Sequence, residues 1–248
     1  MDSLSDKNPL VKQIRRAVSR GMLTEDGYMV AEGTHLLEEA LAAKCEVAAV
    51  IVAESARVHY PDSRIVSDKA FREMASTETP QGVLALVRPP VSTLEQMTVG
   101  NALVVVLDGV QDPGNAGAIL RAAEAFGATG AVFLKGTVNP YNPKCVRGSA
   151  GSVFRVPLVA SLEADQVLKY TQLAWYAAMP RAQKLVSDAD LIAPCGIIIG
   201  SEGQGVEPAL AGYATGLRIP TAGVESLNAA VAAGIMLYEA RRQRGTAR

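Results

Sequence analysis

The sequence predicts an α/β protein of two domains, in which buried strands alternate with helices. Three apolar runs of strand length occupy residues 102–108, 131–134 and 196–200. A polar stretch that contains glycine follows each of them. Such uninterrupted runs are typical of parallel strands, because helices cover both faces of a parallel sheet. Pro89 and Pro90 follow the last strand expected in the first half and mark a linker. We therefore expect one domain over residues 1–98 and a second over residues 99–248.

The first half alternates helices and strands within fewer than 100 residues. Strands are expected at residues 28–33, 47–53, 64–66 and 81–87, and helices at residues 7–20, 34–44 and 67–75. The first of these helices is basic on one side, with Lys7, Lys12, Arg15, Arg16 and Arg20. This side is either a solvated helix face or an edge that contacts nucleic-acid phosphates, and the sequence leaves both open.

The second half continues the alternation. Strands are expected at residues 102–108, 131–134, 153–159, 173–178, 196–200 and 217–219, and helices at about 116–126 and 162–170. A glycine-rich loop occupies residues 109–117, and residues 137–152 form a loop without regular periodicity that carries Lys144 and Arg147.

The chain ends with a polar turn and a long helix. Pro220 stops the last strand, and Ser226 is a suitable N-cap for the helix that follows. One face of this helix carries apolar residues and a glycine at helical spacing, namely Leu227, Val231, Gly234, Ile235 and Tyr238, and the facing residues are mostly small. We expect this face to lie close to a neighbouring segment, either of the same chain or of a partner. The turn is either a plain helix cap or a polar binding site.

Composition limits the function classes. Hydrophobic residues make up 49% of the chain, charged residues 20%, and the formal net charge is −1, as is ordinary for soluble globular proteins. Nucleic-acid binding would therefore need a local basic patch rather than a basic protein. Because no apolar run reaches 18 residues and residues 1–7 lack an apolar segment, we expect neither a membrane span nor a secretory signal. Three widely spaced cysteines indicate reduced thiols in a cytoplasmic protein, without a disulfide framework or a zinc site.

Three polar loops follow buried strands, after Leu107, Ile199 and Ile219. Ligands bind at the carboxyl ends of strands in open parallel sheets, so these loops are the expected place for a site. They and the helices that follow them offer Asn115, Arg121, Glu202, Ser226 and Asn228. Most of these side chains do not titrate near neutral pH, which favours binding, orientation and charge stabilisation over a proton relay.

Several common chemistries lack support. Neither a G-x-G-x-x-G opening a helix after a strand nor a G-x-x-x-x-G-K-[ST] occurs, and no residues have metal-ligand spacing, so no metal is expected. His35 and His59 lie in the first half, away from the polar loops. Pro194 and Cys195 form a dipeptide that some base-modifying enzymes use for covalent attack. Cys195 precedes the strand at 196–200, so we expect it at the amino end of the sheet, as a small buried residue rather than a nucleophile.

Residues 112–127, 199–205 and 219–231 together resemble the three ordered motifs of the SpoU (TrmH) family of RNA 2′-O-ribose methyltransferases, within the SPOUT class. The resemblance covers about residues 101–240. The first half is similar, more weakly, to the substrate-binding domain often fused to this family, through residues 30–40 and 80–83.

This resemblance implies a deep trefoil knot in the C-terminal domain, an exception to the rule that protein chains avoid knots. It implies S-adenosylmethionine bound in the knot and a homodimer whose interface builds the site. It also implies an RNA substrate, ribosomal RNA in preference to transfer RNA, while the modified nucleotide and the part that the N-terminal domain plays in its choice stay open.

The motif match assigns roles to individual residues. Arg121 matches the catalytic arginine, Asn115 its neighbour in the site and Glu202 the acid of the second motif. Ser226 and Asn228 match the pair near the reacting ribose. Cofactor contacts, largely through the backbone, are implied for Gly200, Ile219 and Leu227. Two mild departures from the pattern, Ser201 and Ala230, remove none of these residues.

The chemistry fits methyl transfer, with one difficulty. A 2′-hydroxyl must be partly deprotonated and aligned with an electrophilic methyl group, whereas an arginine, with a pKa above about 12, is a poor base. We hypothesise that an RNA phosphate holds Arg121, which polarises the hydroxyl or accepts its proton, while Ser226 and Asn228 orient it. The alternatives are a binding module, either a knotted RNA-binding protein that has lost transfer or a ribosome assembly factor, and a Rossmann-like small-molecule enzyme. The intact polar residues argue against the first, and the absent G-x-G-x-x-G argues against the second.

Overall fold

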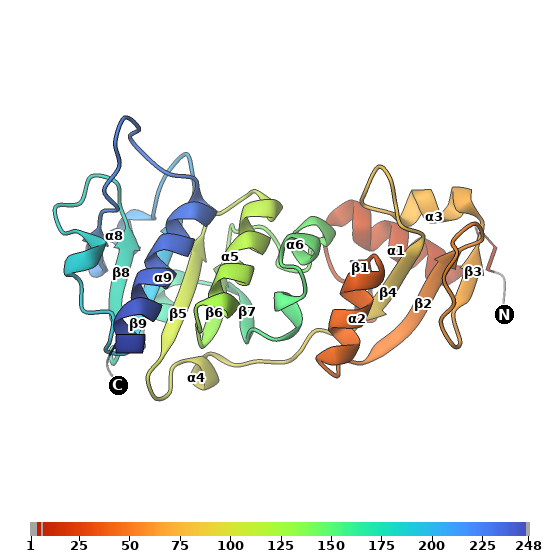
Figure 1. The fold of residues 1–248 in the computed structure, drawn as a ribbon, viewed down its shortest axis with the longest axis horizontal. Coiled ribbons are helices and arrows are strands. Elements are labelled where there is room, and N and C mark those ends of the chain that lie inside the picture. The colour runs from red at the N-terminus through yellow and green to blue at the C-terminus, as the bar shows by residue number, and fades with distance from the viewer. Residues whose placement is uncertain (1–3, 6, 247–248) are drawn as a thin grey trace. The chain divides into compact units, whose positions relative to one another are not determined.

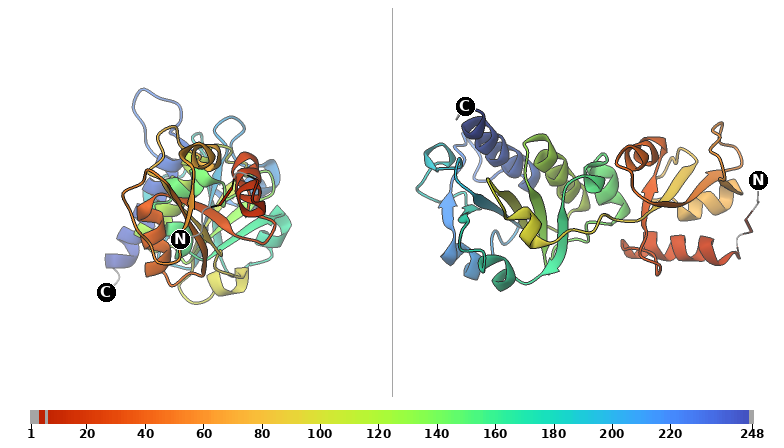
Figure 2. Two further views of the ribbon diagram at one scale, coloured as in Figure 1. Left: turned by 90° about the vertical axis from the view of Figure 1, so that its right-hand side faces the viewer. Right: turned by 90° about the horizontal axis from the view of Figure 1, so that it is seen from below.

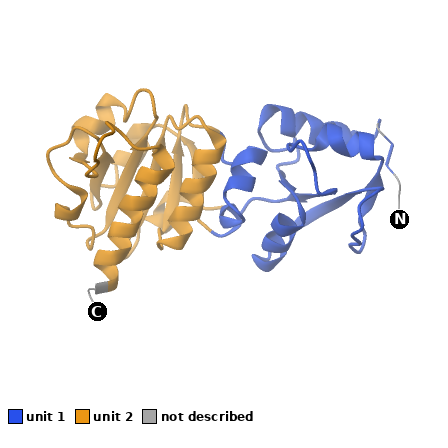
Figure 3. Cartoon of the chain, turned by 45° about the horizontal axis from the view of Figure 1, so that its top comes forward, with its two compact units in different colours: residues 1–90, 139–155 blue, residues 91–138, 156–248 orange. Residues whose placement is uncertain are grey.

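The computed structural model describes residues 4, 5 and 7–246, and the chain falls into two compact units (Figure 3). The first unit consists of Met1–Pro90 and Asn139–Arg155, and the second of Val91–Val138 and Val156–Arg248. These units differ from the expected division at residue 98 in two segments. Residues 91–98 pack with the second unit through Leu94 and Met97, and residues 139–155 cluster with the first. The assignment of RNA binding to residues 1–98 and of methyl transfer to residues 99–248 stays a prediction.

The first unit is a four-stranded sheet of order β1-β4-β2-β3, antiparallel except for the β2–β3 pair. Its elements are α1 (Pro9–Arg20), β1 (Met29–Glu32), α2 (Thr34–Ala42), β2 (Val47–Ala53), β3 (Arg64–Val66), α3 (Asp68–Met74), β4 (Val83–Val87) and α6 (Pro143–Gly148). Helices α1 and α3 cover one face, where Ile14 and Phe71 are buried against Leu84. Two arginines of α1 form ion pairs, Arg15 with Glu73 and Arg16 with Glu25.

The second unit is a six-stranded parallel sheet of order β10-β8-β9-β5-β6-β7 (Figure 1). Its strands are β5 (Leu103–Asp108), β6 (Gly130–Leu134), β7 (Leu158–Leu162), β8 (Ala174–Ala178), β9 (Cys195–Gly200) and β10 (Thr215–Leu217). Its α-helices are α4 (Leu94–Met97), α5 (Pro113–Ala125), α7 (Ala164–Leu168), α8 (Pro208–Tyr213) and α9 (Ala229–Thr246), with a short 3-10 helix, η2 (Val186–Asp188).

Helices cover both faces of this sheet. Helices α5 and α9 pack side by side on one face (Figures 1 and 2). On the other face, Met97, Val167 and Leu210 of α4, α7 and α8 are buried in one cluster with Val104 and Ile198 of the central strands. The buried apolar runs that predicted parallel strands therefore lie where that pattern requires.

Four local predictions were wrong. Helix α5 begins three residues earlier than expected, because Asp112 Oδ1 accepts a hydrogen bond from Asn115 N at 2.7 Å and Pro113 occupies the first turn. The irregular loop at 137–152 contains α6, which Asn142 caps. A strand was expected over residues 153–159, but Ser152–Phe154 form a 3-10 helix, η1, and β7 starts at Leu158. The apolar character of this segment reflects burial of Val153 and Phe154 rather than strand structure. The expected linker contains α4, which begins with a capping box at Thr93.

The C-terminal helix differs from its prediction in its start and in its buried face. Asn228 caps α9, accepting hydrogen bonds from Ala230 N at 2.9 Å and Val231 N at 3.3 Å, so the N-cap predicted at Ser226 was wrong. The side chains buried against the sheet and α5 are Ala229, Ala233, Met236, Leu237 and Ala240. Val231 and Tyr238, on the face predicted to pack closely, are 50% and 54% exposed. Helix α9 therefore has a second apolar face that is only partly covered within the chain: Val231 is half exposed, and the ring of Tyr238 contacts that of Phe126 edge to face, with ring centroids 5.7 Å apart.

The described part of the chain has no helix long and apolar enough to cross a membrane. Among the same residues, no three His, Cys, Asp or Glu side chains are grouped as metal ligands would be. The trefoil knot implied by the family resemblance stays a prediction.

Candidate active site

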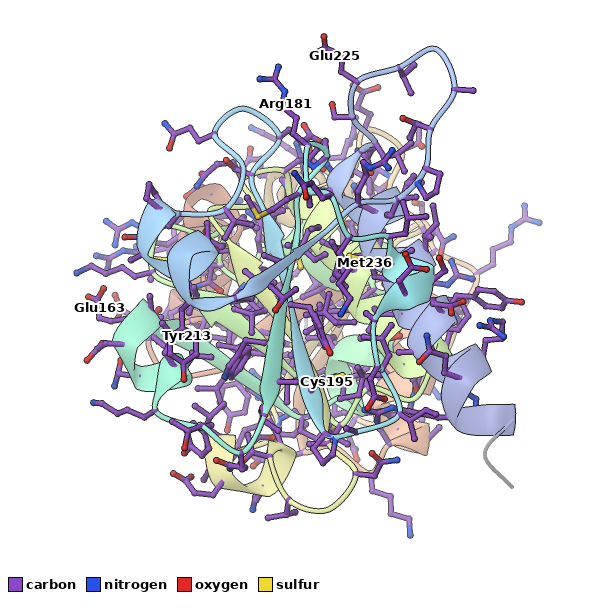
Figure 4. The ribbon with its side chains drawn as sticks, turned by 90° about the vertical axis from the view of Figure 1, so that its left-hand side faces the viewer. Glu163, Arg181, Cys195, Tyr213, Glu225 and Met236 are labelled. Atoms are coloured by element: carbon purple, nitrogen blue, oxygen red, sulfur yellow. The ribbon has the colours of Figure 1, made fainter. Side chains whose placement is uncertain are left out.

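The loops after β8, β9 and β10 surround a cavity of about 730 Å³ at the carboxyl edge of the parallel sheet. Apolar side chains line part of it, including Ile199, Leu217 and Leu227, and polar groups of the loops line the rest. Figure 4 shows Arg181 and Glu225 on two of these loops, at the end of the sheet remote from Cys195. Two of the three polar loops predicted to form a site, those after β9 and β10, line this cavity; the third wall is the loop after β8, which was not predicted, and the loop after β5 does not line it.

A tight turn after β9 forms one wall of this cavity. Ser201 N donates to Gly205 O at 3.0 Å, and Gly205 N donates to Ser201 O at 2.9 Å. A Cβ atom on Gly200 would lie 2.2 Å from the Gly205 carbonyl carbon, so only glycine allows the turn to fold back against the strand end. The turn presents Glu202, Gly203 and Gln204 at the carboxyl edge.

Three side chains from separate segments form a hydrogen-bonded cluster at this wall. Glu202 Oε1 accepts from Asn115 Nδ2 at 2.8 Å and from Asn228 Nδ2 at 2.9 Å. Asn228 Nδ2 also lies 3.0 Å from Asn115 Oδ1. Because Asn228 Oδ1 caps α9, its amide nitrogen is held toward the other two residues. The first turns of α5 and α9 and the β9 turn therefore fix one polar cluster, which we call the Asn-Glu-Asn cluster.

The predicted site residues separate into two groups. Six of them line the larger cavity, namely Gly200, Glu202, Ile219, Ser226, Leu227 and Asn228, and Asn115 joins through its hydrogen bonds. Arg121 lies outside both this cavity and the smaller one described below. It follows Asn115 by six residues on α5, about 9 Å along the helix axis, and its side chain is exposed. One chain alone does not gather all eight residues.

A second cavity, of about 530 Å³, lies on the other side of the β9 turn. Residues 201–204 line both cavities, and Gln111, Asp112 and Asn115 complete the polar part of the smaller one. Sequence reasoning did not select Gln111, Asp112 or Gln204. The available signal was their position, because all three lie in or beside the polar loops after β5 and β9.

The opposite edge of the sheet contains Cys195. Its thiol is fully buried, and burial raises its pKa, only partly offset by Arg244, whose Nη2 lies 3.5 Å from Sγ. A thiol held in its neutral form is a poor nucleophile. The predicted place of Cys195, at the amino end of the sheet and away from the polar loops, is confirmed.

Comparisons with known proteins identify the family of this chain. The model of the SpoU rRNA methylase family matches residues 102–238, and that of the MRM3-like substrate binding domain matches residues 8–85. An uncharacterised tRNA/rRNA methyltransferase of Synechocystis sp. is 37% identical, with 98% of this chain and 94% of the relative covered. The 23S rRNA (guanosine(2553)-2′-O)-methyltransferase RlmP of Bacillus subtilis is 32% identical, with 96% and 98% covered.

Solved structures give the same result. The SpoU methyltransferase AviRb from Streptomyces viridochromogenes, in complex with the cofactor AdoMet, aligns with a TM-score of 0.86 and 26% identity, covering 98% of this chain and 100% of that one. AdoMet-bound rRNA methyltransferase from Sinorhizobium meliloti aligns with a TM-score of 0.85 and 28% identity, covering 97% of each chain. With a family model over more than half of its length and full-length relatives above 30% identity, the chain belongs to the SpoU rRNA methylase family.

Proposed function

We propose that this protein transfers the methyl group of S-adenosylmethionine to a ribose 2′-hydroxyl of ribosomal RNA. Family membership supports the reaction, and the relatives named above act on RNA. The observation that carries the proposal is the Asn-Glu-Asn cluster at the wall of the 730 Å³ cavity. There the chain gathers the residues of three separate motifs at one point.

The larger cavity fits the cofactor. Ile199, Leu217 and Leu227 offer apolar surface for the adenine ring, and loop backbone groups beside Gly200 and Ile219 offer partners for its polar edge. The carboxylates of Glu202 and Glu225 suit the positive charges of a sulfonium and an amino group. When bound, S-adenosylmethionine supplies an electrophilic methyl group.

The residues of the Asn-Glu-Asn cluster position the acceptor hydroxyl. Two amide groups hold Glu202 in place, so its carboxylate is oriented before the substrate arrives. Asn228 is fixed because it caps α9. Ser226, on the exposed turn before α9, adds a hydroxyl that can form a hydrogen bond with the ribose. This preorganisation favours an aligned 2′-hydroxyl over one that rotates freely.

Arg121 acts on the charge that develops on the 2′-oxygen. A guanidinium stays protonated at neutral pH, so its natural tasks are to hold an RNA phosphate and to stabilise the forming oxyanion. Its side chain is exposed on α5, where an RNA phosphate can reach it.

The active form is a homodimer in this proposal. Arg121 is exposed on α5, and α9, which packs beside α5, carries the half-exposed apolar side chains Val231 and Tyr238. A second copy packed on this surface would bury the apolar side chains and bring its Arg121 toward the Asn-Glu-Asn cluster of the first copy. The separation of Arg121 from the other site residues within one chain supports this arrangement.

Ribosomal RNA is proposed as the substrate in preference to transfer RNA, because relatives of full length modify 23S ribosomal RNA. In the first unit, Lys12 and Arg20 are exposed on α1 and are available to RNA phosphates. A cytoplasmic location is proposed on the same grounds.

The test is tritium transfer from labelled S-adenosylmethionine to bulk ribosomal RNA and, separately, to transfer RNA. We expect label in ribosomal RNA and a loss of at least about 100-fold in Arg121→Ala, because a charge-stabilising group is removed while folding is unaffected. Lys169→Ala, which removes an exposed cation next to α7, on the face of the sheet opposite α5 and α9, is the control and should transfer normally. Cofactor binding without transfer to any RNA would instead favour the binding-module hypothesis, and near-normal Arg121→Ala activity would remove Arg121 from the site.

A further inference from the structure

We propose that Asp108 is a positioning residue for the methyl-transfer site, because its buried carboxylate holds the segment that carries Glu202. This inference rests on the proposed function, in which Glu202 orients the acceptor hydroxyl. Asp108 is the last residue of β5, and its exposed fraction is 8%. It lines neither of the two cavities, so any influence on the reaction passes through other residues.

The backbone of Glu207 holds the carboxylate of Asp108. Its Oδ2 accepts a hydrogen bond from Glu207 N at 2.6 Å. Within the described part of the chain, no lysine or arginine forms an ion pair with this carboxylate. An apolar residue, as at the preceding positions of β5, would be buried here at less cost. Core packing alone therefore does not account for an acid at this position.

The hydrogen bond closes a segment that begins and ends at Asp108. In the parallel pairing of β5 with β9, Gly200 is the register partner of Asp108. The chain then passes through the tight turn at residues 201–205 and returns to Asp108 at Glu207. The carboxylate thus holds the far end of the segment next to its near end.

Glu202 lies inside this closed segment. Its carboxylate accepts hydrogen bonds from the amides of Asn115 and Asn228, at the starts of α5 and α9. The two amides set the position of Glu202 on one side, and the backbone of the segment sets it on the other. Closure at Glu207 restricts the backbone, so the carboxylate has fewer positions to occupy before the substrate arrives.

The composition of the segment makes this closure important. Gly203 and Gly205 give its backbone more freedom than other residues would, and Gly205 has a φ angle of +73°. Residues 202–205 are exposed, so packing restrains them little. Beyond the turn, Val206 is only partly buried against the core. The hydrogen bond of Asp108 is therefore the main polar contact that stops the segment from opening.

The first measurement follows the side-chain amide signals of Asn115 and Asn228 by NMR, without cofactor or RNA. These amides donate to Glu202, so their signals report its position whether or not the protein transfers methyl groups. Asp108→Ala should shift both signals in the same direction as Glu202→Ala does. Asp108→Asn keeps an oxygen for Glu207 N and should leave the signals near their wild-type positions.

Two outcomes of this measurement overturn the proposal. The first is that both signals stay unchanged in Asp108→Ala. The second is a shift in Asp108→Asn as large as that in Asp108→Ala, because the effect would then not depend on the hydrogen bond. Val104→Ala, which removes buried atoms from the same strand, controls for a general loss of stability and should move neither signal.

The second measurement is a double-mutant cycle in methyl transfer. Asp108→Ala should lower transfer at least about 10-fold, whereas the double variant with Glu202→Gln should be no slower than Glu202→Gln alone. A merely structural role would multiply the two losses, and that result overturns the proposal. If the wild-type protein labels no RNA, the proposed function fails, and the NMR measurement still decides whether Asp108 holds the segment.

Where Asp108→Ala does not fold, Glu207→Pro tests the same hydrogen bond from the donor side. Glu207 has a φ angle of −53°, which proline adopts, and its side chain does not cap α8. The substitution removes the backbone N–H and should shift the signals of Asn115 and Asn228. Glu207→Gln keeps the N–H and should leave them in place. Identical signals in these two variants overturn the proposal.

Discussion

The two edges of the parallel sheet satisfy their polar groups in different ways. At the carboxyl edge, Asn115, Glu202 and Asn228 bond to one another at a cavity wall and keep acceptor atoms free for a ligand. At the amino edge, the guanidinium of Arg244 donates to the carbonyls of Leu191, Asn101, Ala102 and Ala193. The carboxyl edge thus keeps polar groups available for a ligand, whereas four carbonyls of the amino edge are hydrogen-bonded within the chain by Arg244.

Helix α9 connects the two edges. Its first turn is capped by Asn228 at the carboxyl edge, and its last turns hold the amino edge through Gln243 and Arg244. Gln243 Oε1 accepts from Leu191 N at 2.9 Å, and its Nε2 donates to Ala189 O at 3.1 Å. One helix therefore fixes both Asn228, a residue of the proposed site, and the hydrogen bonds of the amino edge. A change at one end should affect activity, and a change at the other should affect stability.

The largest effect is expected at the carboxyl edge, in Glu202→Gln. The variant keeps the shape of the side chain, but it removes the negative charge and places an amide near the amide nitrogens of Asn115 and Asn228. We expect methyl transfer to fall at least about 100-fold with a melting temperature close to that of the wild type. Tritium transfer and thermal unfolding measure the two quantities.

Glu207→Gln is the matched control for this variant. Glu207 is an exposed residue close to Glu202 in sequence, and its side chain lies outside the lining of both cavities. It should retain normal transfer. If Glu202→Gln is as active as this control, the cluster does not orient the acceptor hydroxyl. The carboxyl edge would then differ from the amino edge in structure but not in function.

A second prediction asks whether the carboxyl edge is complete within one chain. If a homodimer builds each site from Arg121 of one copy and the Asn-Glu-Asn cluster of the other, two inactive variants should complement each other. Arg121→Ala mixed in equal amounts with Glu202→Gln, after subunit exchange, should recover up to about a quarter of wild-type transfer, because half of the dimers would contain one intact site.

The absence of complementation would contradict the shared site. If each site lies within a single chain, every chain in the mixture carries one defect, and transfer stays at the level of the separate variants. Arg121→Ala mixed with Arg121→Ala,Glu202→Gln serves as the control, since no intact site can form in that pair. Recovery in the control would point to contamination by wild-type protein.

The sequence predicted the carboxyl edge better than the helix that borders it. Buried apolar runs located the central strands, and the polar residues that follow them identified Asn115, Glu202 and Asn228. The buried face of α9 was not predictable in the same way, because the helix has two apolar stripes and periodicity does not distinguish an internal stripe from an exposed one. The smaller cavity also escaped prediction, since Gln111 and Gln204 come together only through the pairing of β5 with β9.

The smallest effect is expected at the amino edge, in Arg244→Ala. Removing the guanidinium leaves four carbonyls that need water as a replacement partner, so we expect a loss of about 2–4 kcal/mol in unfolding free energy and a melting temperature lower by roughly 5–12 °C. Trp175, the single tryptophan, is buried in β8, so its fluorescence during urea unfolding reports on the second unit. Arg241→Ala, which removes an exposed arginine of the same helix, should change the transition much less. Methyl transfer per folded molecule at a temperature well below the transition should be unchanged in both variants. Normal stability with lost transfer in Arg244→Ala would mean that the amino edge also shapes the reaction site, and would remove the division of roles between the two ends of α9.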